Sequence, residues 1–309
     1  MEKKTTNTKT LLDIYNDDAK RLECRVGKDR SLNTLNVLQQ GRGYVVNFLL
    51  EQKGIADIRL DSLTPQFIHE FSVWLSATKG LRCGTVWLMC QQLKGVVARA
   101  YQRGEITWNP FAGFRIAKRI RPRQYLTEEE LFKLIAHEFK CEKLRFARDI
   151  FVFSAFTGLS FIDIQKLKQS DLVVLGGVMW IISKRHKTNV PYQVRLLDIP
   201  LEILKRYQQP DREYVFGNME YRTMAWRIKR VMEEVGFPKH ITMHCGRHSF
   251  AVLAINKGMP IESISRILGH TNITTTQIYA KITMNKIDSD MVELGKKLST
   301  QSHIGYVER

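Results

Sequence analysis

Residues 172–198, "LVVLGGVMWIISKRHKTNVPYQVRLLD", differ from the rest of the chain because their pattern favours β-strands. Gly176-Gly177 separates two runs rich in Val, Ile and Trp, which predicts a hairpin, and a further strand is expected at 191–198. On both sides of this stretch, apolar residues recur at helical spacing. The sequence therefore predicts a mainly α fold with a small antiparallel β-sheet.

The helical patterns fall into two groups, separated by a break at Gly104 and Pro110. A Thr127 and Glu130 capping box restarts the second group. We expect a helical domain at 1–112, a basic linker at 113–124 and a second domain at 125–309. Helices are predicted at 34–52, 65–78, 85–102, 145–159, 200–208, 219–235, 244–257, 260–268, 273–281 and 284–298.

Charge is the strongest signal in the composition, with a formal net charge of +17 over 309 residues. Residues 1–124 hold 21 Lys and Arg against 11 Asp and Glu, and the remainder hold 27 against 20. Basic excess in both parts favours a nucleic-acid binder, although ribosomes, acidic proteins and membrane surfaces also attract basic proteins.

Cysteine usage and hydropathy bound the cellular compartment. The five cysteines are scattered, which is typical of reduced thiols and not of a disulfide framework or a zinc site. The polar N-terminus predicts no signal peptide, and no apolar run reaches the roughly 20 residues of a membrane span. We expect a cytoplasmic protein.

The segment "RIAKRIRPRQYL" (115–126) is dense in cations. It is either a solvated linker or a strap that lies along a DNA backbone. Basic regions on both sides favour the strap. Its candidate DNA-binding residues are Arg115, Lys118, Arg119, Arg121 and Arg123.

The stretch "MHCGRHSFAVLAI" (243–255) places His244, Arg247 and His248 on one face at the start of a helix. A metalloprotease-like zinc site would need Glu where Cys245 stands, so we predict no metal here. A core role suits His248, which leads into an apolar run. It suits Arg247 poorly, because a buried Arg needs an anion or a carboxylate.

Several motifs in a fixed order carry a family resemblance. They are "GEITWNPF" (104–111), "YLTEEEL" (125–131), "TGLSFIDIQKL" (157–167), "KRHKT" (184–188), "HCGRH" (244–248) and "LGHTNITTTQIY" (268–279). Together they resemble the tyrosine recombinases, the phage-integrase family, over essentially the whole chain. The resemblance implies an N-terminal helical core-binding (SAM-like) domain, a mixed α/β catalytic domain, double-stranded DNA as partner and no cofactor.

The resemblance also implies roles for single residues. An aromatic among apolar residues is usually a packing residue, but Tyr279 matches the family's nucleophile, which forms a 3′-phosphotyrosyl link. Arg247 would clamp the non-bridging oxygens. His244 and His270 would hydrogen-bond the same phosphate, and Asp163 matches a carboxylate that supports the site from behind.

Two positions in the motifs leave roles open. The general acid should be a hairpin lysine, with Lys187 favoured over Lys184. The arginine that most members carry after "TGL" is replaced by Ser160, which cannot supply a bidentate charged fork. In this respect the chain resembles a subset of integrases from conjugative transposons, which also lack this arginine. We expect Arg185 to compensate; reduced or lost activity are the alternatives.

The predicted C-terminal helix carries an apolar stripe of Met284, Ile287, Met291, Leu294 and Leu298. It either docks on its own domain or, as the resemblance implies and as we favour, is donated to a neighbouring protomer in a tetramer on two DNA sites.

We predict a site-specific recombinase of the integrase or invertase type, working at the nucleoid. The short polar segment before the first helix favours a compact integrase or an inversion or resolution enzyme. The alternatives are a type IB topoisomerase with the same chemistry and a recombinase-derived DNA-binding regulator without catalysis.

Overall fold

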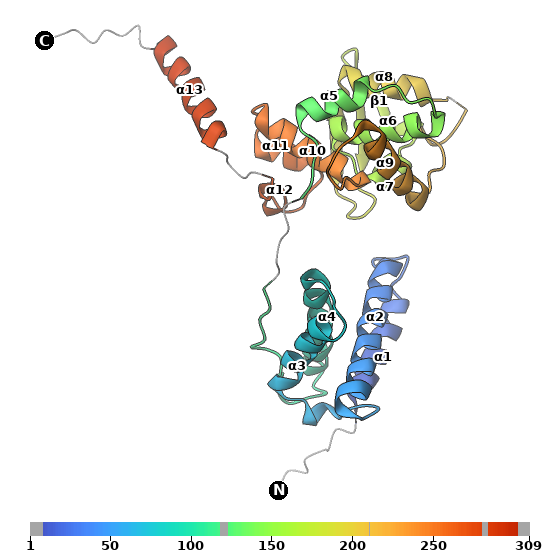
Figure 1. The fold of residues 1–309 in the computed structure, drawn as a ribbon, viewed down its shortest axis with the longest axis vertical. Coiled ribbons are helices and arrows are strands. Elements are labelled where there is room, and N and C mark those ends of the chain that lie inside the picture. Colours follow the sequence, from blue (N-terminus) through green and yellow to red (C-terminus); the bar gives the residue numbers. More distant parts are fainter. Residues whose placement is uncertain (1–8, 118–122, 210, 280–283, 302–309) are drawn as a thin grey trace, which may run out of the picture. The chain divides into compact units, whose positions relative to one another are not determined.

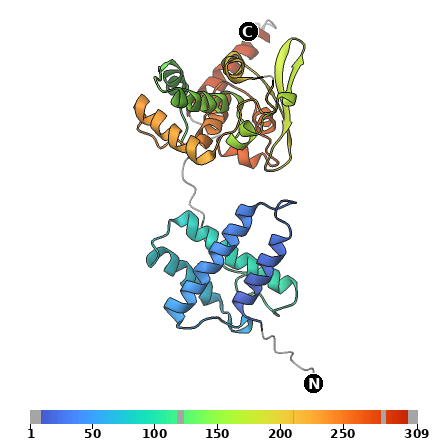
Figure 2. The same cartoon turned by 90° about the vertical axis from the view of Figure 1, so that its right-hand side faces the viewer.

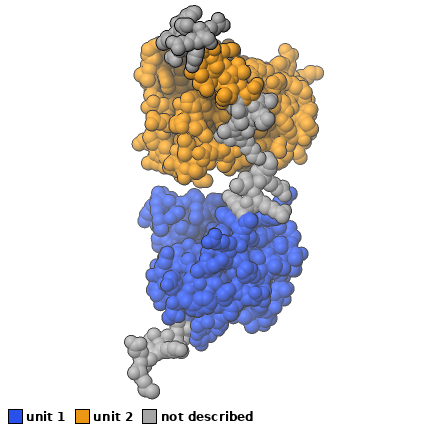
Figure 3. Space-filling view, turned by 90° about the vertical axis from the view of Figure 1, so that its left-hand side faces the viewer, with its two compact units in different colours: residues 1–121 blue, residues 122–309 orange. Residues whose placement is uncertain are grey.

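The chain divides into two compact units, residues 1–121 and 122–309 (Figure 3). The structure is a computed structural model that describes residues 9–117, 123–209, 211–279 and 284–301. Helices dominate both units, and the described residues contain one small antiparallel sheet (Figure 1). The predicted fold class, mainly α with a small antiparallel sheet, is therefore confirmed.

In the described part of unit 1, residues 9–117, four α-helices pack around a shared core (Figure 2). A capping box starts α1, because the Thr10 side chain accepts from the Asp13 N–H while the Asp13 carboxylate accepts from the Thr10 N–H. α2 continues into a π-helical segment, Leu49–Lys53, and a 3₁₀ turn follows at Leu60–Ser62. The helices are α1 (Leu11–Glu23), α2 (Leu32–Phe48), α3 (Pro65–Ala77) and α4 (Cys83–Gln102).

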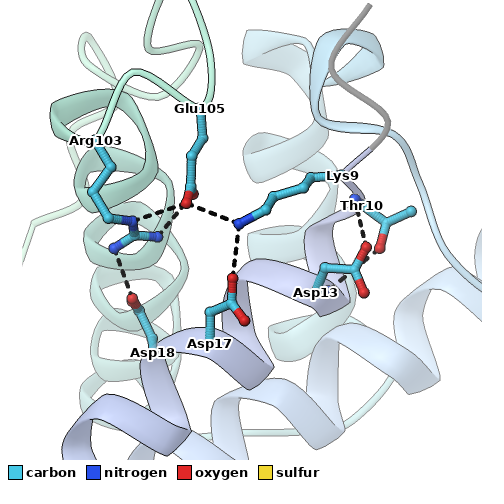
Figure 4. Close-up of polar contacts among 7 residues, drawn as sticks. All are labelled: Lys9, Thr10, Asp13, Asp17, Asp18, Arg103 and Glu105. Atoms are coloured by element: carbon cyan, nitrogen blue, oxygen red, sulfur yellow. Dashed lines mark hydrogen bonds and ion pairs between the residues drawn. The ribbon is translucent and has the colours of Figure 1, made fainter.

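Ion pairs join the first helix of unit 1 to the end of its last helix (Figure 4). The Lys9 ammonium contacts Asp17 at 2.8 Å and Glu105 at 3.0 Å. The Arg103 guanidinium contacts Glu105 and the buried Asp18, both at 2.9 Å. Positive and negative groups alternate along this cluster, so its charges nearly balance.

Unit 2 is built around α6 (Glu142–Thr157), which packs against α8, α9 and α10. A helix surrounded by others must be apolar on most sides, which explains the near-continuous apolar run predicted as a buried helix. The helices outside α6 are α5 (Glu128–Ala136), α7 (Phe161–Gln165), α8 (Asp198–Tyr207), α9 (Tyr221–Val235), α10 (Met243–Asn256), α11 (Ile261–Ile267), α12 (Thr274–Gln277) and α13 (Met284–Gln301).

The sheet has the strand order β1-β2-β3, with β1 at Leu172–Leu175, β2 at Val178–Lys184 and β3 at Pro191–Arg195. Gly176 and Gly177 have φ of 56° and 75°, as the hairpin turn requires. The predicted third strand is too long, because α8 begins at Asp198. The helix predicted at 273–281 is also too long, because α12 ends at Gln277.

Two close approaches fix the helices that carry the site. Gly158 follows the last residue of α6, and its φ of 73° and close neighbour Phe250 leave no room for a side chain. α10 crosses α6 at Gly246, where an added Cβ would lie 3.0 Å from the Phe151 carbonyl oxygen. The first turn of α10 is thereby held beside the last turn of α6.

The last described helix, α13, exposes the apolar side chains of Met291, Leu294 and Leu298. The side chains of Met284 and Ile287, also predicted for its stripe, lie outside the described residues. No helix in the described ranges is both long enough and apolar enough to cross a membrane.

Candidate active site

Arg247 lies at the centre of the site, in the first turn of α10, and is 2% exposed. Its Nη1 donates to the Gly158 carbonyl oxygen at 2.9 Å, and its Nη2 donates to the Leu268 carbonyl oxygen at 2.6 Å. No carboxylate of the described residues lies within ion-pair distance of it. Burial and the neighbouring Arg185 lower the pKa of Arg247 to about 9, so the guanidinium is charged at neutral pH.

Arg185, directly after β2, lies beside Arg247. Its Nη1 donates to the same Leu268 carbonyl oxygen, at 3.1 Å, and its Nε lies 3.1 Å from the Asp163 carboxylate. Gly269 allows this approach: its φ is 58°, and an added Cβ would lie 2.6 Å from the Arg185 Cγ. Two guanidiniums therefore converge on one backbone oxygen.

Asp163, in α7, is buried and holds the turn between β2 and β3. Its Oδ2 accepts from the Ser160 hydroxyl at 2.6 Å, and its Oδ1 accepts from the His186 N–H at 2.9 Å. Ser160 thus donates to Asp163, which in turn pairs with Arg185. Ser160, where the resemblance led us to expect an arginine, therefore supports the carboxylate that pairs with Arg185.

The His270 ring bridges Arg247 and Thr276. Its Nε2 lies 2.8 Å from the Arg247 Nη2, and its Nδ1 lies 2.8 Å from the Thr276 hydroxyl. Because a guanidinium can only donate, Nε2 must accept, and the proton of the neutral ring is on Nδ1. Burial and the charge of Arg247 lower the pKa of His270 to about 4, in agreement with a neutral ring.

Tyr279 has both a packed ring and a polar contact. Its ring lies against the small core around Phe250, and its hydroxyl lies 2.6 Å from the His248 Nδ1. The Arg123 guanidinium lies 6.0 Å from the ring centre. Burial raises the pKa of Tyr279, whereas the charges of Arg123 and Arg247 oppose that rise. Tyr279 is thus a half-buried phenol beside cations.

His244, at the surface in the first turn of α10, meets His248 edge to face with ring centres 4.4 Å apart. Partial desolvation and then the charge of Arg247 lower the pKa of His244 to about 4. Lys187 is exposed in the β2–β3 turn, and its charge contributes to this lowering. Lys184, at the end of β2, lines a hollow with Lys166, Lys168 and Asp163.

The structure brings most of the predicted site residues together. Contacts join them into two groups. Tyr279 and His244 meet through His248. Arg247, His270, Arg185 and Asp163 form the other group, in which the two arginines share the Leu268 carbonyl oxygen. Lys187 is near the cluster without a hydrogen bond to it. His248 and Thr276 also contact site residues, although neither was predicted to belong to the site. For His248, the available signal was its position directly after Arg247 on the same helix.

The predicted DNA strap is described only in part. Arg115 is exposed in an irregular segment of unit 1, and Arg123 is exposed in unit 2 with its guanidinium near Tyr279. Lys118, Arg119 and Arg121 lie outside the described residues.

Family profiles match both parts of the chain. The phage integrase family matches residues 124–286, and the phage integrase SAM-like domain matches residues 10–119. Tyrosine recombinase XerD of Listeria innocua is 32% identical over 142 residues, which cover 41% of this chain and 47% of that protein. This alignment spans about half the relative's length. Tyrosine recombinase XerC of Xylella fastidiosa is 25% identical, with 83% and 88% covered.

Solved structures share the fold. The Tn1549 transposon integrase, in complex with a circular intermediate DNA, superimposes with a TM-score of 0.73 at 20% identity, covering 92% of this chain and 99% of that chain. A lambda integrase dimer bound to a COC′ core site gives a TM-score of 0.68 at 21% identity, covering 88% and 77%.

Proposed function

The chain belongs to the phage integrase family of tyrosine recombinases, and we propose that it is a site-specific DNA recombinase that works through a 3′-phosphotyrosyl intermediate. The observation that carries the proposal is that the guanidiniums of Arg247 and Arg185 meet at one backbone oxygen, with Asp163 as the one carboxylate paired to them among the described residues. The charge of Arg247 also acts on the phenol of Tyr279. Buried positive charge in excess needs an anion, and a DNA phosphate beside a phenol is the anion that this arrangement suits.

The proposed reaction exchanges one phosphodiester bond for another. The Tyr279 oxygen attacks the scissile phosphorus, the bond to the 5′-oxygen breaks, and the protein is left on the DNA 3′ end. The 5′-hydroxyl of a second strand then attacks the phosphotyrosine and releases Tyr279. Because each step conserves a phosphoester, no ATP is consumed and the residues above need no metal or cofactor.

The side chains act on the charge that develops at phosphorus. Arg247 and Arg185 donate to the non-bridging oxygens, because a guanidinium presents two parallel donors to a phosphate. His270 and His244 hydrogen-bond the same phosphate, and Asp163 positions Arg185. Lys187 protonates the leaving 5′-oxygen. Lys187 is favoured over Lys184 because its charge contributes to the lowered pKa of His244.

Arg185 replaces the arginine that Ser160 lacks, and a matched pair of variants tests this role. Arg185→Ala should slow covalent adduct formation by about 10²-fold, the effect of losing one donor to a developing oxyanion. Arg230→Ala is the control, because Arg230 is exposed and pairs with Glu233 on the surface of α9. If Arg185→Ala were as fast as Arg230→Ala, and Ser160→Arg had no effect either, the compensation would be disproved.

Binding and assembly complete the proposal. Residues 1–112 form the core-binding domain, 113–124 a strap on the DNA backbone through Arg115, Lys118, Arg119, Arg121 and Arg123, and 125–309 the catalytic domain. α13 is donated to a neighbouring protomer in a tetramer on two sites. Support comes from the exposed apolar side chains of Met291, Leu294 and Leu298 on α13, and from an apolar hollow of about 770 Å³ in unit 2 lined by Trp180, Phe250 and Met259.

The cellular setting follows from this function. The enzyme works in the cytoplasm, at the nucleoid, on double-stranded DNA of a mobile element. The narrower likeness to conjugative-transposon integrases that lack the first arginine stays a prediction, and insertion, excision and inversion are all outcomes of the same chemistry.

The experiment that tests the function uses supercoiled plasmids carrying the DNA that flanks the gene. Wild-type protein and Tyr279→Phe are incubated with them, the reaction is stopped with SDS, and protein attached to a DNA 3′ end is measured. An adduct with wild type alone supports the recombinase. Tight binding without an adduct would favour the non-catalytic regulator, and relaxation of any plasmid by monomers would favour the topoisomerase.

A further inference from the structure

His248 stands between the predicted nucleophile and a residue of the basic strap. Its Nδ1 lies 2.6 Å from the Tyr279 hydroxyl oxygen, and its Nε2 lies 3.3 Å from the Arg123 Nη1. The ring is 5% exposed. Its two nitrogens therefore contact side chains of the site, whereas a histidine that only filled the core would need neither of these partners.

The partners of His248 determine where its proton is. Arg123 can only donate, so Nε2 accepts and the neutral ring carries its proton on Nδ1. That N–H then points at the Tyr279 oxygen and donates to it. Burial, His244 and the charge of Arg123 lower the pKa of His248 to about 3, so the ring does not charge at neutral pH.

We propose that His248 is a positioning residue for Tyr279, which holds the phenol oxygen through its Nδ1–H, and that Arg123 fixes the tautomer that makes this possible. The inference rests on the proposed function, since it concerns the same nucleophile. In this arrangement His248 keeps its own proton and is a donor to the oxygen, not the base that removes the tyrosine proton.

Donation to the oxygen has two consequences for the attack. It restricts the phenol to one direction, and misplacement of a reacting atom by about 1 Å costs on the order of 10²-fold in rate. It also favours the negative charge that the oxygen acquires as its proton leaves. Arg123 connects both effects to the strap, because the same side chain fixes the His248 tautomer and lies over the Tyr279 ring.

Two substitutions separate the donor from the bulk of the ring. His248→Asn keeps an N–H at the place of Nδ1, and His248→Leu fills similar space without a donor. On nicked DNA that traps the adduct, His248→Leu should slow adduct formation by about 10–100-fold with unchanged DNA affinity. His248→Asn should recover most of the rate. Equal rates for the two variants would overturn the proposal.

A second measurement does not depend on activity. The phenol of Tyr279 is titrated in DNA-free protein by NMR of ¹³C-labelled tyrosine, with Tyr279→Phe identifying its signal. The other charged groups that face it are Arg123, before α5, and Arg247 of α10, so the titration is followed at the Tyr279 signal itself. Burial and the neighbouring Arg185 lower the pKa of Arg247 to about 9, which both His248 variants share with wild type. His248→Leu should move the titration to higher pH, and His248→Asn should restore it. An unchanged titration in His248→Leu would overturn the proposal.

These measurements distinguish the failure of each idea. Absence of an adduct with wild type contradicts the proposed function, while the titration still decides whether His248 donates to Tyr279.

If His248→Leu does not fold, ¹⁵N NMR of the histidines compares wild type with Arg123→Ala. The His248 proton should reside on Nδ1 in wild type and shift toward Nε2 in the variant; a proton on Nε2 in wild type would overturn the proposal. A purely structural role would lower the melting temperature of both His248 variants without moving the titration.

Discussion

Each unit of the chain contains a cluster of charged side chains, and the two clusters differ in balance. In unit 1, Lys9 and Arg103 alternate with Asp17, Asp18 and Glu105, so every cation has a carboxylate beside it (Figure 4). These contacts join α1 to the end of α4. The balanced cluster is complete within the protein and needs no further ligand.

In unit 2, Arg247 and Arg123 act on Tyr279, and Arg185 lies beside Arg247. Among the described residues, Asp163 is the one carboxylate paired to these guanidiniums. Backbone carbonyl oxygens, not acids, receive the donors of Arg247. Buried charges of one sign raise the energy of the free protein, and an anion relieves that cost. The two clusters therefore differ in charge balance and not in charge density. The cluster of unit 1 is neutralised within the protein, whereas the excess positive charge of unit 2 suits a phosphate.

The largest effect is expected from Arg247→Lys, which keeps the charge and removes the fork. Adduct formation on a trapping DNA should slow by about 10²–10³-fold, because donors to the developing oxyanion are lost. Arg103→Lys is the matched change in unit 1, and its adduct rate should equal that of wild type. Similar losses in the two variants would end the distinction between the clusters.

A smaller effect is expected from a substitution at Gly269, which changes the packing of the site and none of its charges. Gly269→Ala places a Cβ against the Arg185 Cγ, so Arg185 must move, and adduct formation should slow by about tenfold. Gly236→Ala is the control, because Gly236 also has a positive φ, of 80°, but no atom within 4 Å of the added Cβ. Both should lose about 1 kcal/mol of stability. Equal rates would show that Arg185 is not held by this approach.

Arg103→Ala should affect stability and not chemistry. Asp18 keeps the exposed Arg99 as a partner, so the loss should be about 1–2 kcal/mol, less than for a fully broken buried pair. Urea unfolding monitored by hydrogen exchange would locate the loss in unit 1. A slower adduct rate per folded molecule would contradict the expectation.

The two units should also differ in acid sensitivity. The pKa values of His244, His248 and His270 are lowered to about 4, 3 and 4, so the unfolded chain takes up protons below about 6.5 while the folded protein does not. The free energy of unfolding of unit 2 should therefore fall as the pH decreases from 6.5 towards 4.

In unit 1, the hydrogen bond from Arg103 lowers the pKa of Glu105, so its contribution is lost only as the pH falls below about 4.5. Hydrogen exchange followed by mass spectrometry between pH 7 and 5 should show faster opening in unit 2 alone. Parallel losses in both units would refute this assignment.

The sequence predicted those features that depend on near neighbours in the chain. The Gly176-Gly177 turn and the Thr127–Glu130 capping box were both confirmed, because the groups that form them are at most a few residues apart. Helix ends were less accurate, as for 273–281, because tertiary contacts decide where a short helix stops.

The candidate site was predicted through the order of its motifs, and its internal contacts were not. The residue types at 244, 247, 270 and 279 could be selected, but the roles assigned to them remain predictions. His248 was interpreted as a core residue; it is buried, yet it also contacts Tyr279. The sequence gives no sign that Arg123, 125 positions earlier, is its second partner.

Composition and local spacing were enough to establish the helical character, the hairpin at Gly176-Gly177, the excess of basic residues and the order of the motifs. Only the tertiary structure decided that Arg185 and Arg247 donate to one carbonyl oxygen. The tertiary structure also decided that Ser160 donates to Asp163, which pairs with Arg185, and that the Tyr279 hydroxyl lies within hydrogen-bond distance of His248. The physical reason is that these contacts join helices and loops whose approach is set by packing, above all at Gly158, Gly246 and Gly269, where a side chain would keep the backbones apart.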